Sequence, residues 1–254
     1  MRKQRKWLPW SVTPLRVLFV LLLLAGSASA DLSTEEILKK ADEARGNLKG
    51  VQWEVSVVSK EKERTTEMVF FVQARGFDVL ATSLFPAKDK GNKILLVSGN
   101  MWFHKPGLSK PVPISQRQKL VGMASYGDIA STNYAADYEA IHQRDENVAD
   151  EPCHVYDLKG RSNKVTYDRI TYWVSRERLV GVKAEYYTVS GKMLKKASME
   201  YDQFVEVDGE RRPFISRIEI QDVLMTADST TLEFDKTVLR EIPDHVYNLN
   251  LLAR

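Results

Sequence analysis

The sequence contains very little cysteine. Cys153 is the only cysteine among its 254 residues. A single cysteine excludes an intramolecular disulfide, a CxxC redox motif and a zinc site made of cysteines. We therefore interpret Cys153 as a buried thiol that packs as a small hydrophobic side chain.

Catalytic and metal-binding motifs are lacking as well. No GxSxG elbow, phosphate-binding glycine loop or GxGxxG follows a predicted strand. No metal-like spacing such as HxxxH or HExxH joins the four histidines, which are His104, His142, His154 and His245. Asp128 and Asp137 are interpreted as turn formers and caps rather than as a catalytic pair. We predict no enzyme, no metal site and no cofactor, although a triad built from distant serines and histidines stays open.

Only one long apolar run occurs, at residues 17–25 (VLFVLLLLA). It follows basic residues and precedes Ala28-Ser29-Ala30, a small-x-small cleavage pattern. The sequence therefore predicts a signal peptide over residues 1–30, cleaved after Ala30, and one mature domain over residues 31–254. The run is too short for a comfortable membrane span. An uncleaved N-terminal anchor is the alternative.

The chain also lacks a large net charge once residues 1–30 are set aside. Of its 37 basic and 34 acidic residues, five basic residues and no acidic ones lie in residues 1–30. The mature chain therefore has 32 basic against 34 acidic residues, a net charge of −2. Nucleic acid is not an expected partner, because binding to phosphates depends on a basic surface.

The mature chain is predicted to begin with a helix. Ser33 and Glu36 form a capping box, in which each side chain satisfies the other residue's backbone N–H. The apolar residues that follow are spaced to share one helical face: Ile37, Leu38, Ala41, Ala44 and Leu48.

Alternating runs predict strands over most of the remaining chain. Val51 to Val57 alternates apolar with polar residues, and glycine-containing turns such as Ser98-Gly99 and Asp208-Gly209 join further runs. About ten strands with short connections predict a mainly β (α+β) fold, a curved antiparallel sheet covered by one or two helices.

A central segment, residues 101–137, interrupts this pattern. It combines a Pro106-Gly107 turn, a short PVPIS strand and a passage rich in Gly, Ser and Asn, and ends on a short helical run near residues 134–141. A connection of this length in a β-rich chain is more often functional than idle.

Several motifs occur in order within and after this segment: Trp102 with Pro106, Pro113-Ile114-Ser115, Ser125-x-Gly127-Asp128, Asn133-Tyr134-x-x-Asp137-Tyr138 and Pro243-x-x-Val246-Tyr247. In these motifs the mature chain resembles the outer-membrane lipoprotein-sorting proteins, the LolA-like family. The resemblance implies an incomplete antiparallel β-barrel whose open side is covered by helices around an apolar cavity.

Side chains on the apolar phase of their strands are the predicted lipid-binding lining: Trp53, Val55, Val57, Phe70, Val72, Phe77, Val79, Trp102, Val182 and Tyr186. An ordinary packed core between helix and sheet is the alternative for these residues. In the central segment, the residues predicted to form a lid or gate are Gly122, Gly127, Asp128, Asn133 and Tyr134.

The resemblance implies a monomeric periplasmic carrier for the acyl chains of a lipoprotein or a phospholipid, which it delivers toward the outer membrane. An inner-membrane transporter or an outer-membrane acceptor is the expected protein partner. Two alternatives stay open: a lipid-sensing or transporter-associated adaptor module, and a lipid-modifying enzyme.

Overall fold

The computed structural model of the protein describes residues 32–130, 133–225 and 228–253. The predicted signal peptide and its cleavage point after Ala30 lie outside these ranges. No helix in the described ranges is both long enough and apolar enough to cross a membrane.

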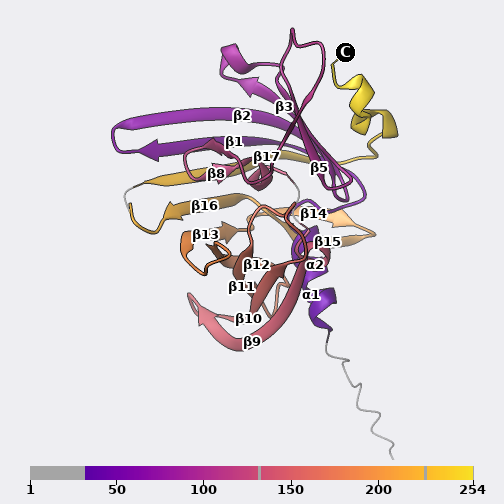
Figure 1. Ribbon diagram of the computed structural model, residues 1–254. Helices are drawn as coiled ribbons and strands as arrows, with labels where there is room; N and C mark the ends of the chain where they lie inside the picture. Colours follow the sequence, from indigo (N-terminus) through magenta and orange to yellow (C-terminus); the bar gives the residue numbers. More distant parts are fainter. Residues whose placement is uncertain (1–31, 131–132, 226–227, 254) are drawn as a thin grey trace, which may run out of the picture. The chain divides into compact units, whose positions relative to one another are not determined.

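One large antiparallel sheet forms the framework of the described residues (Figure 1). It has thirteen strands, more than the expected number of about ten. Their order is β6 (Val112–Ile114), β5 (Asn100–His104), β4 (Lys93–Val97), β3 (Asp78–Phe85), β2 (Arg64–Arg75), β1 (Val51–Glu61), β17 (Ser229–Leu239), β16 (Arg217–Asp222), β13 (Met193–Glu200), β12 (Gly181–Tyr187), β11 (Arg169–Ser175), β10 (Glu151–Gly160) and β9 (Tyr138–Val148). The sheet stays open, with β6 and β9 as its edges. The predicted mainly β fold is confirmed.

Smaller elements complete the fold. Two hairpins form separate two-stranded sheets, β7 (Lys119–Val121) with β8 (Ala124–Ser125) and β14 (Gln203–Val207) with β15 (Glu210–Phe214). Short 3-10 helices lie at η1 (Ala87–Asp89), η2 (Tyr126–Asp128), η3 (Asp244–Tyr247) and η4 (Leu249–Leu251). The α-helices of the described residues are α1 (Thr34–Glu43) and α2 (Tyr134–Asp137). The helical run expected to extend to residue 141 is therefore shorter, because Tyr138 already pairs with Gly160 as the first residue of β9.

The predicted capping box begins α1. Ser33 Oγ accepts a hydrogen bond from the Glu36 N–H at 3.3 Å, and Glu36 Oε2 accepts one from the Ser33 N–H at 2.8 Å. The face of α1 that carries Ile37, Leu38 and Ala41 is buried. This apolar face packs into the main core of the sheet.

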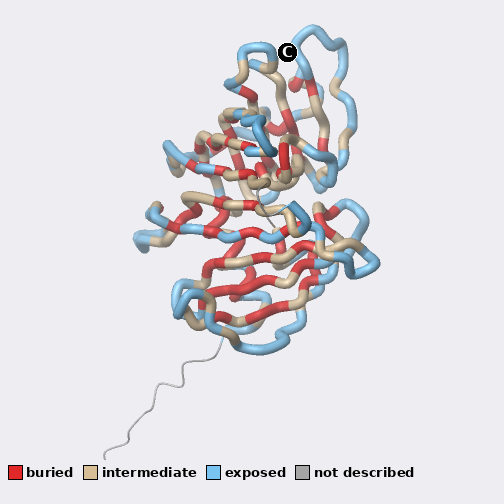
Figure 2. The backbone as a smooth tube through the Cα atoms, turned by 90° about the vertical axis from the view of Figure 1, so that its left-hand side faces the viewer, coloured by how far each residue is buried: buried red, intermediate tan, exposed pale blue. Residues whose placement is uncertain are grey.

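Strand alternation separates two cores on opposite faces of the sheet. Buried residues follow the strands, and exposed residues gather at the connecting turns (Figure 2). In β1 and β2 the inward residues pair directly, for example Val55 with Phe70. On the other face, a small second core forms beneath the C-terminal segment from Leu95, Ile242, Tyr247 and Leu252.

Two of the predicted lining residues lie elsewhere. Trp102 packs against the second core, because its neighbours Met101 and Phe103 take the inward phase of β5. Phe77 precedes β3 in the turn after β2 and is 47% exposed. The alternation of apolar and polar residues in the sequence predicted that both residues lie on the inner face. In the structure, β3 begins only after Phe77, and the alternation of β5 turns Trp102 to the opposite face.

Candidate functional site

The inner face of the sheet, the face that α1 covers, carries the predicted lining. The eight other residues of that set are all buried in one core: Trp53, Val55, Val57, Phe70, Val72, Val79, Val182 and Tyr186. Phe234 and Leu232 of β17 join them, because they pair with Val55 and Val57. The first half of the sheet therefore presents a continuous apolar surface.

Tyrosines line the second half of the inner face, which the sequence did not indicate as a group. Seven are buried there, and they are Tyr134, Tyr138, Tyr156, Tyr167, Tyr172, Tyr186 and Tyr201. Tyr134 meets the rings of Tyr138 and Tyr172 edge to face at centroid distances of 5.3 and 5.1 Å. Aromatic bodies with polar tips make this half of the face both apolar and able to form hydrogen bonds.

A cover, defined here as Lys119–Asp137 without residues 131–132, lies on the inner face. Its Met123 N–H donates to Thr230 Oγ1 of β17 at 2.8 Å. Gly122 has a φ of +52°, and a Cβ there would collide with the hydroxyls of Ser59 and Thr230. Gly127 likewise leaves no room for a Cβ beside Thr166. These glycines therefore allow close packing of the cover against the sheet and the loop before β11.

A buried ion pair fixes the middle of the cover. Lys195 Nζ of β13 lies 3.0 Å from Asp128 Oδ2, and the two side chains are only 4% and 9% exposed. Lys195 also donates to the Met123 carbonyl. Tyr167 donates its hydroxyl proton to the Asp128 carboxylate, at 2.6 Å from one oxygen, and the Ser125 N–H donates to Oδ2 at 2.7 Å.

A second polar contact joins the cover to α1. Asn133 is the N-cap residue of α2 but forms no side-chain cap. Instead, Asp42 Oδ2 of α1 accepts the Ala135 N–H at 2.8 Å. Burial raises the pKa of Asp42 to about 7, against the lowering effect of the hydrogen bonds from α2. Arg45, also buried, lies over the Tyr134 ring at 5.1 Å, and its Nε and Nη1 have no hydrogen-bond partner.

These contacts share one property. In the described part of the chain the buried charged residues are Asp42, Arg45 and Lys195, and each of them contacts the cover. Charged side chains are rarely buried unless they are paired, because removing them from water is costly. The structure therefore concentrates its buried charge where the cover meets α1 and the sheet.

One small hollow lies beneath the cover. The hollow bounded by Arg45, Trp53, Asp128 and Phe234 has a volume of about 10 Å³, room for a single water molecule at most. Two larger hollows lie outside, between α1 and the β14–β15 hairpin. Their volumes are about 170 and 830 Å³, and both include Glu43, Leu48 and Arg212 in their walls.

Comparison with known proteins adds family context. A family model whose description reads "-like: Uncharacterized protein" matches residues 78–254, whereas no curated protein matches. The chain is 30% identical to a LolA superfamily protein from Nitrosomonas europaea, with a TM-score of 0.76 over 85% of this chain and 98% of that one.

Two further solved structures share the fold at lower identity. A putative outer membrane lipoprotein-sorting protein domain from Vibrio parahaemolyticus is 16% identical, with a TM-score of 0.72 over 87% of this chain and 98% of that one. A DUF1329 family protein from Desulfovibrio piger is 17% identical, with a TM-score of 0.71 over 86% of this chain and 97% of that one.

Proposed function

Since the chain belongs to the LolA superfamily, we propose that it is a monomeric periplasmic carrier, not an enzyme. It takes up the acyl chains of a lipoprotein or a phospholipid against its inner face and delivers them toward the outer membrane. An inner-membrane transporter loads it, or an outer-membrane acceptor unloads it. In this proposal the acyl chain occupies the place that the cover holds in the present structure.

The observation that carries the proposal is the polar attachment of the cover above an apolar face. Lys195, Asp42 and Arg45 hold the cover through hydrogen bonds, an ion pair and a ring contact. When the cover lifts, these groups regain water, which offsets part of the free energy of the lost contacts. Purely apolar attachment would have no such compensation.

The ligand replaces the apolar contacts that are lost when the cover lifts, and so it contributes the favourable apolar free energy. Lifting the cover exposes the face around Val55, Val57 and Phe70, which are at most 2% exposed in the closed structure. Each methylene of an acyl chain contributes roughly 0.8 kcal/mol when it leaves water, so a long chain offers on the order of 10 kcal/mol. An acyl chain is therefore a suitable replacement for the cover.

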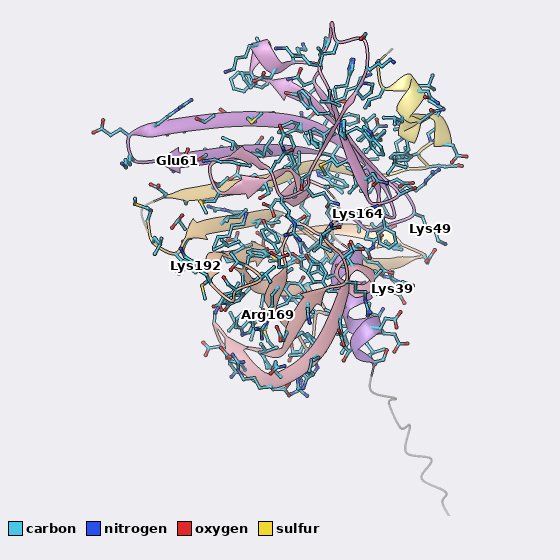
Figure 3. The ribbon with its side chains drawn as sticks, in the orientation of Figure 1. Lys39, Lys49, Glu61, Lys164, Arg169 and Lys192 are labelled. Carbon is cyan, nitrogen blue, oxygen red and sulfur yellow. The ribbon has the colours of Figure 1, made fainter. Side chains whose placement is uncertain are left out.

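The groove between α1 and the β14–β15 hairpin favours a second candidate, an adaptor that binds a transporter. Its larger hollow, of about 830 Å³, is walled by both basic and acidic residues. Lys39 of α1 and Lys49 after it project on this side of the molecule (Figure 3). Such mixed charge at a rim suits a protein partner more than an acyl chain.

The carrier proposal is tested with a fluorescent fatty acid and two groups of variants. Val55→Glu places a carboxylate on the inner face, and Val58→Glu is the matched control because Val58 takes the opposite phase of the same strand and is half-buried. The double substitution Lys195→Ala/Asp128→Ala loosens the cover, because it removes the ion pair without putting apolar contacts in its place. Circular dichroism establishes folding for each protein before binding is measured.

We expect the wild type and Val58→Glu to bind the probe, the loosened variant to bind it more tightly, and Val55→Glu to lose binding. Should Val55→Glu not fold, the comparison of the wild type with the loosened variant decides the question alone. If neither binds the probe while both are folded, the inner face is an ordinary core and the carrier proposal is wrong.

A further inference from the structure

Three metal-ligating side chains converge between β9 and β10, with His142 and Asp145 from the middle of β9 and His154 from the first half of β10. His142 Nε2 and His154 Nδ1 lie 2.9 and 2.8 Å from the same oxygen, Asp145 Oδ1. The two imidazole rings meet edge to face with centroids 5.4 Å apart. All three ligand atoms lie within 4.8 Å of one another.

A bulge in β9 creates this arrangement. The register passes from Arg144 opposite Val155 to His142 opposite Tyr156, so Gln143 has no partner. Residues three apart on a regular strand point to opposite faces, but one extra residue brings His142 and Asp145 to the same face. His154 is the direct partner of Asp145 on β10 and completes the group.

The donor set has a definite chemical preference. Two imidazole nitrogens and one carboxylate oxygen suit Zn²⁺ and related divalent ions, and open zinc sites use three protein ligands with water in the fourth position. We propose that His142 Nε2, His154 Nδ1 and Asp145 Oδ1 form a binding site for a divalent transition-metal ion such as Zn²⁺, independent of the lipid-carrier function.

Only small movements are needed to reach a coordinating arrangement. Tetrahedral bonds of about 2.0–2.1 Å place ligand atoms roughly 3.3 Å apart. The present separations of 2.8 and 2.9 Å are slightly shorter, as expected for hydrogen bonds. Rotation of the half-exposed side chains of His142 and Asp145 widens them. On binding, each coordinating nitrogen gives up its proton, either to the other ring nitrogen or to solvent.

Neighbouring residues hold the group in place. Arg176 Nη1 lies 3.3 Å from Asp145 Oδ2, which orients the carboxylate and leaves Oδ1 to the metal. The guanidinium charge opposes a cation, but its side chain is 52% exposed, so solvent screens it. Buried Tyr156 packs against both imidazoles at 5.6 and 6.1 Å.

A bound ion would join the edge strand of the sheet to its neighbour. β9 is paired on one side only, and the bulge interrupts that pairing next to His142. Metal bonds across β9 and β10 replace the interrupted backbone contacts at this point. The expected consequence is a rise in melting temperature with added metal, because an ion that binds only the folded state stabilises it.

The test is a Zn²⁺ titration of the purified, chelator-stripped protein by calorimetry, repeated with Co²⁺ and read by visible absorption. His142→Ala, His154→Ala and Asp145→Asn remove one ligand each. His245→Ala is the matched control, because His245 is exposed and lies outside the cluster. All four positions are exposed or half-exposed, and thermal melts without metal check that each variant folds.

We expect about one Zn²⁺ per chain, a Co²⁺ spectrum of nitrogen and oxygen ligation, and a melting temperature raised by Zn²⁺. Each histidine substitution should weaken binding by at least about 100-fold, and His245→Ala should change nothing. Binding should also weaken at acidic pH, because protons compete for imidazole. The proposal is overturned by a wild type without saturable binding, or by equal binding in the cluster variants and the control.

Discussion

Replacing Lys195 by Met tests whether the cover is held by its buried ion pair. The ammonium group lies 3.0 Å from Asp128 and also binds the Met123 carbonyl. Methionine has a similar length, so the change removes the charge while filling most of the space. Because both side chains are nearly inaccessible, water cannot replace the lost partner in the closed structure.

The expected loss of unfolding free energy depends on which contacts the remaining partner keeps. Breaking a buried pair costs about 3–5 kcal/mol. After Lys195→Met, Asp128 keeps its bonds from Tyr167 and Ser125, so we expect about 3 kcal/mol. Asp128→Ala removes the acceptor of all three groups and leaves the ammonium with the Met123 carbonyl, so we expect about 5 kcal/mol. In melting temperature these costs correspond to roughly 6–12 °C and 10–20 °C.

Urea unfolding followed by tryptophan fluorescence measures these changes. The double variant Lys195→Met/Asp128→Ala should be more stable than the two single costs predict, by about 1–3 kcal/mol, because the partners act together. Lys236→Met is the matched control. Its ion pair with Glu54 is shorter, at 2.8 Å, but Lys236 is 65% exposed, so its loss should cost far less free energy of unfolding than the loss of Lys195. Equal costs for Lys195→Met and Lys236→Met would refute the reasoning.

Three further predictions concern the cover and the exported chain. Burial raises the pKa of Asp42 from 3.8 to about 7, so the free energy of unfolding should fall by up to about 4 kcal/mol as pH rises through this range. Asp42→Asn should remove that slope in urea titrations, and an unchanged slope contradicts the assignment. Gly122→Ala should destabilise the fold by about 1–3 kcal/mol through its collision, whereas Gly99→Ala, also at positive φ but with open space, should cost less. N-terminal sequencing of the exported protein should find cleavage after Ala30, and an intact N-terminus speaks against export as a processed protein.

Local features of the fold followed from the sequence because they depend on neighbouring residues. The capping box at Ser33 and the alternation from Val51 to Val57 are both present. Ser98-Gly99 and Asp208-Gly209 have positive φ at both positions, as expected for tight hairpin turns. Such features need no knowledge of which distant strands meet.

Features set by long-range register did not follow from the sequence. Asp128 and Lys195 are 67 positions apart, and nothing near either residue indicates the pairing. Trp102 is large and apolar, as expected of an inner-face residue, but the alternation of β5 places its side chain on the opposite face of the sheet. The cluster of His142, Asp145 and His154 depends on a bulge, so a search for helical metal spacings could not detect it.

The placement of buried charge favours the proposed carrier face over a core built only for stability. Replacing a buried ion pair by apolar residues of similar size is often neutral or stabilising, so charge at Lys195, Asp42 and Arg45 is not needed to fill space. Each of these groups instead touches the one segment whose removal would uncover the apolar half of the sheet. In the proposed function, the charges return to water on opening and recover solvation free energy, while an acyl chain replaces the apolar contacts. The same contacts that close the face therefore lower the cost of opening it, and this is the property that a carrier requires if it is to bind its lipid and release it again.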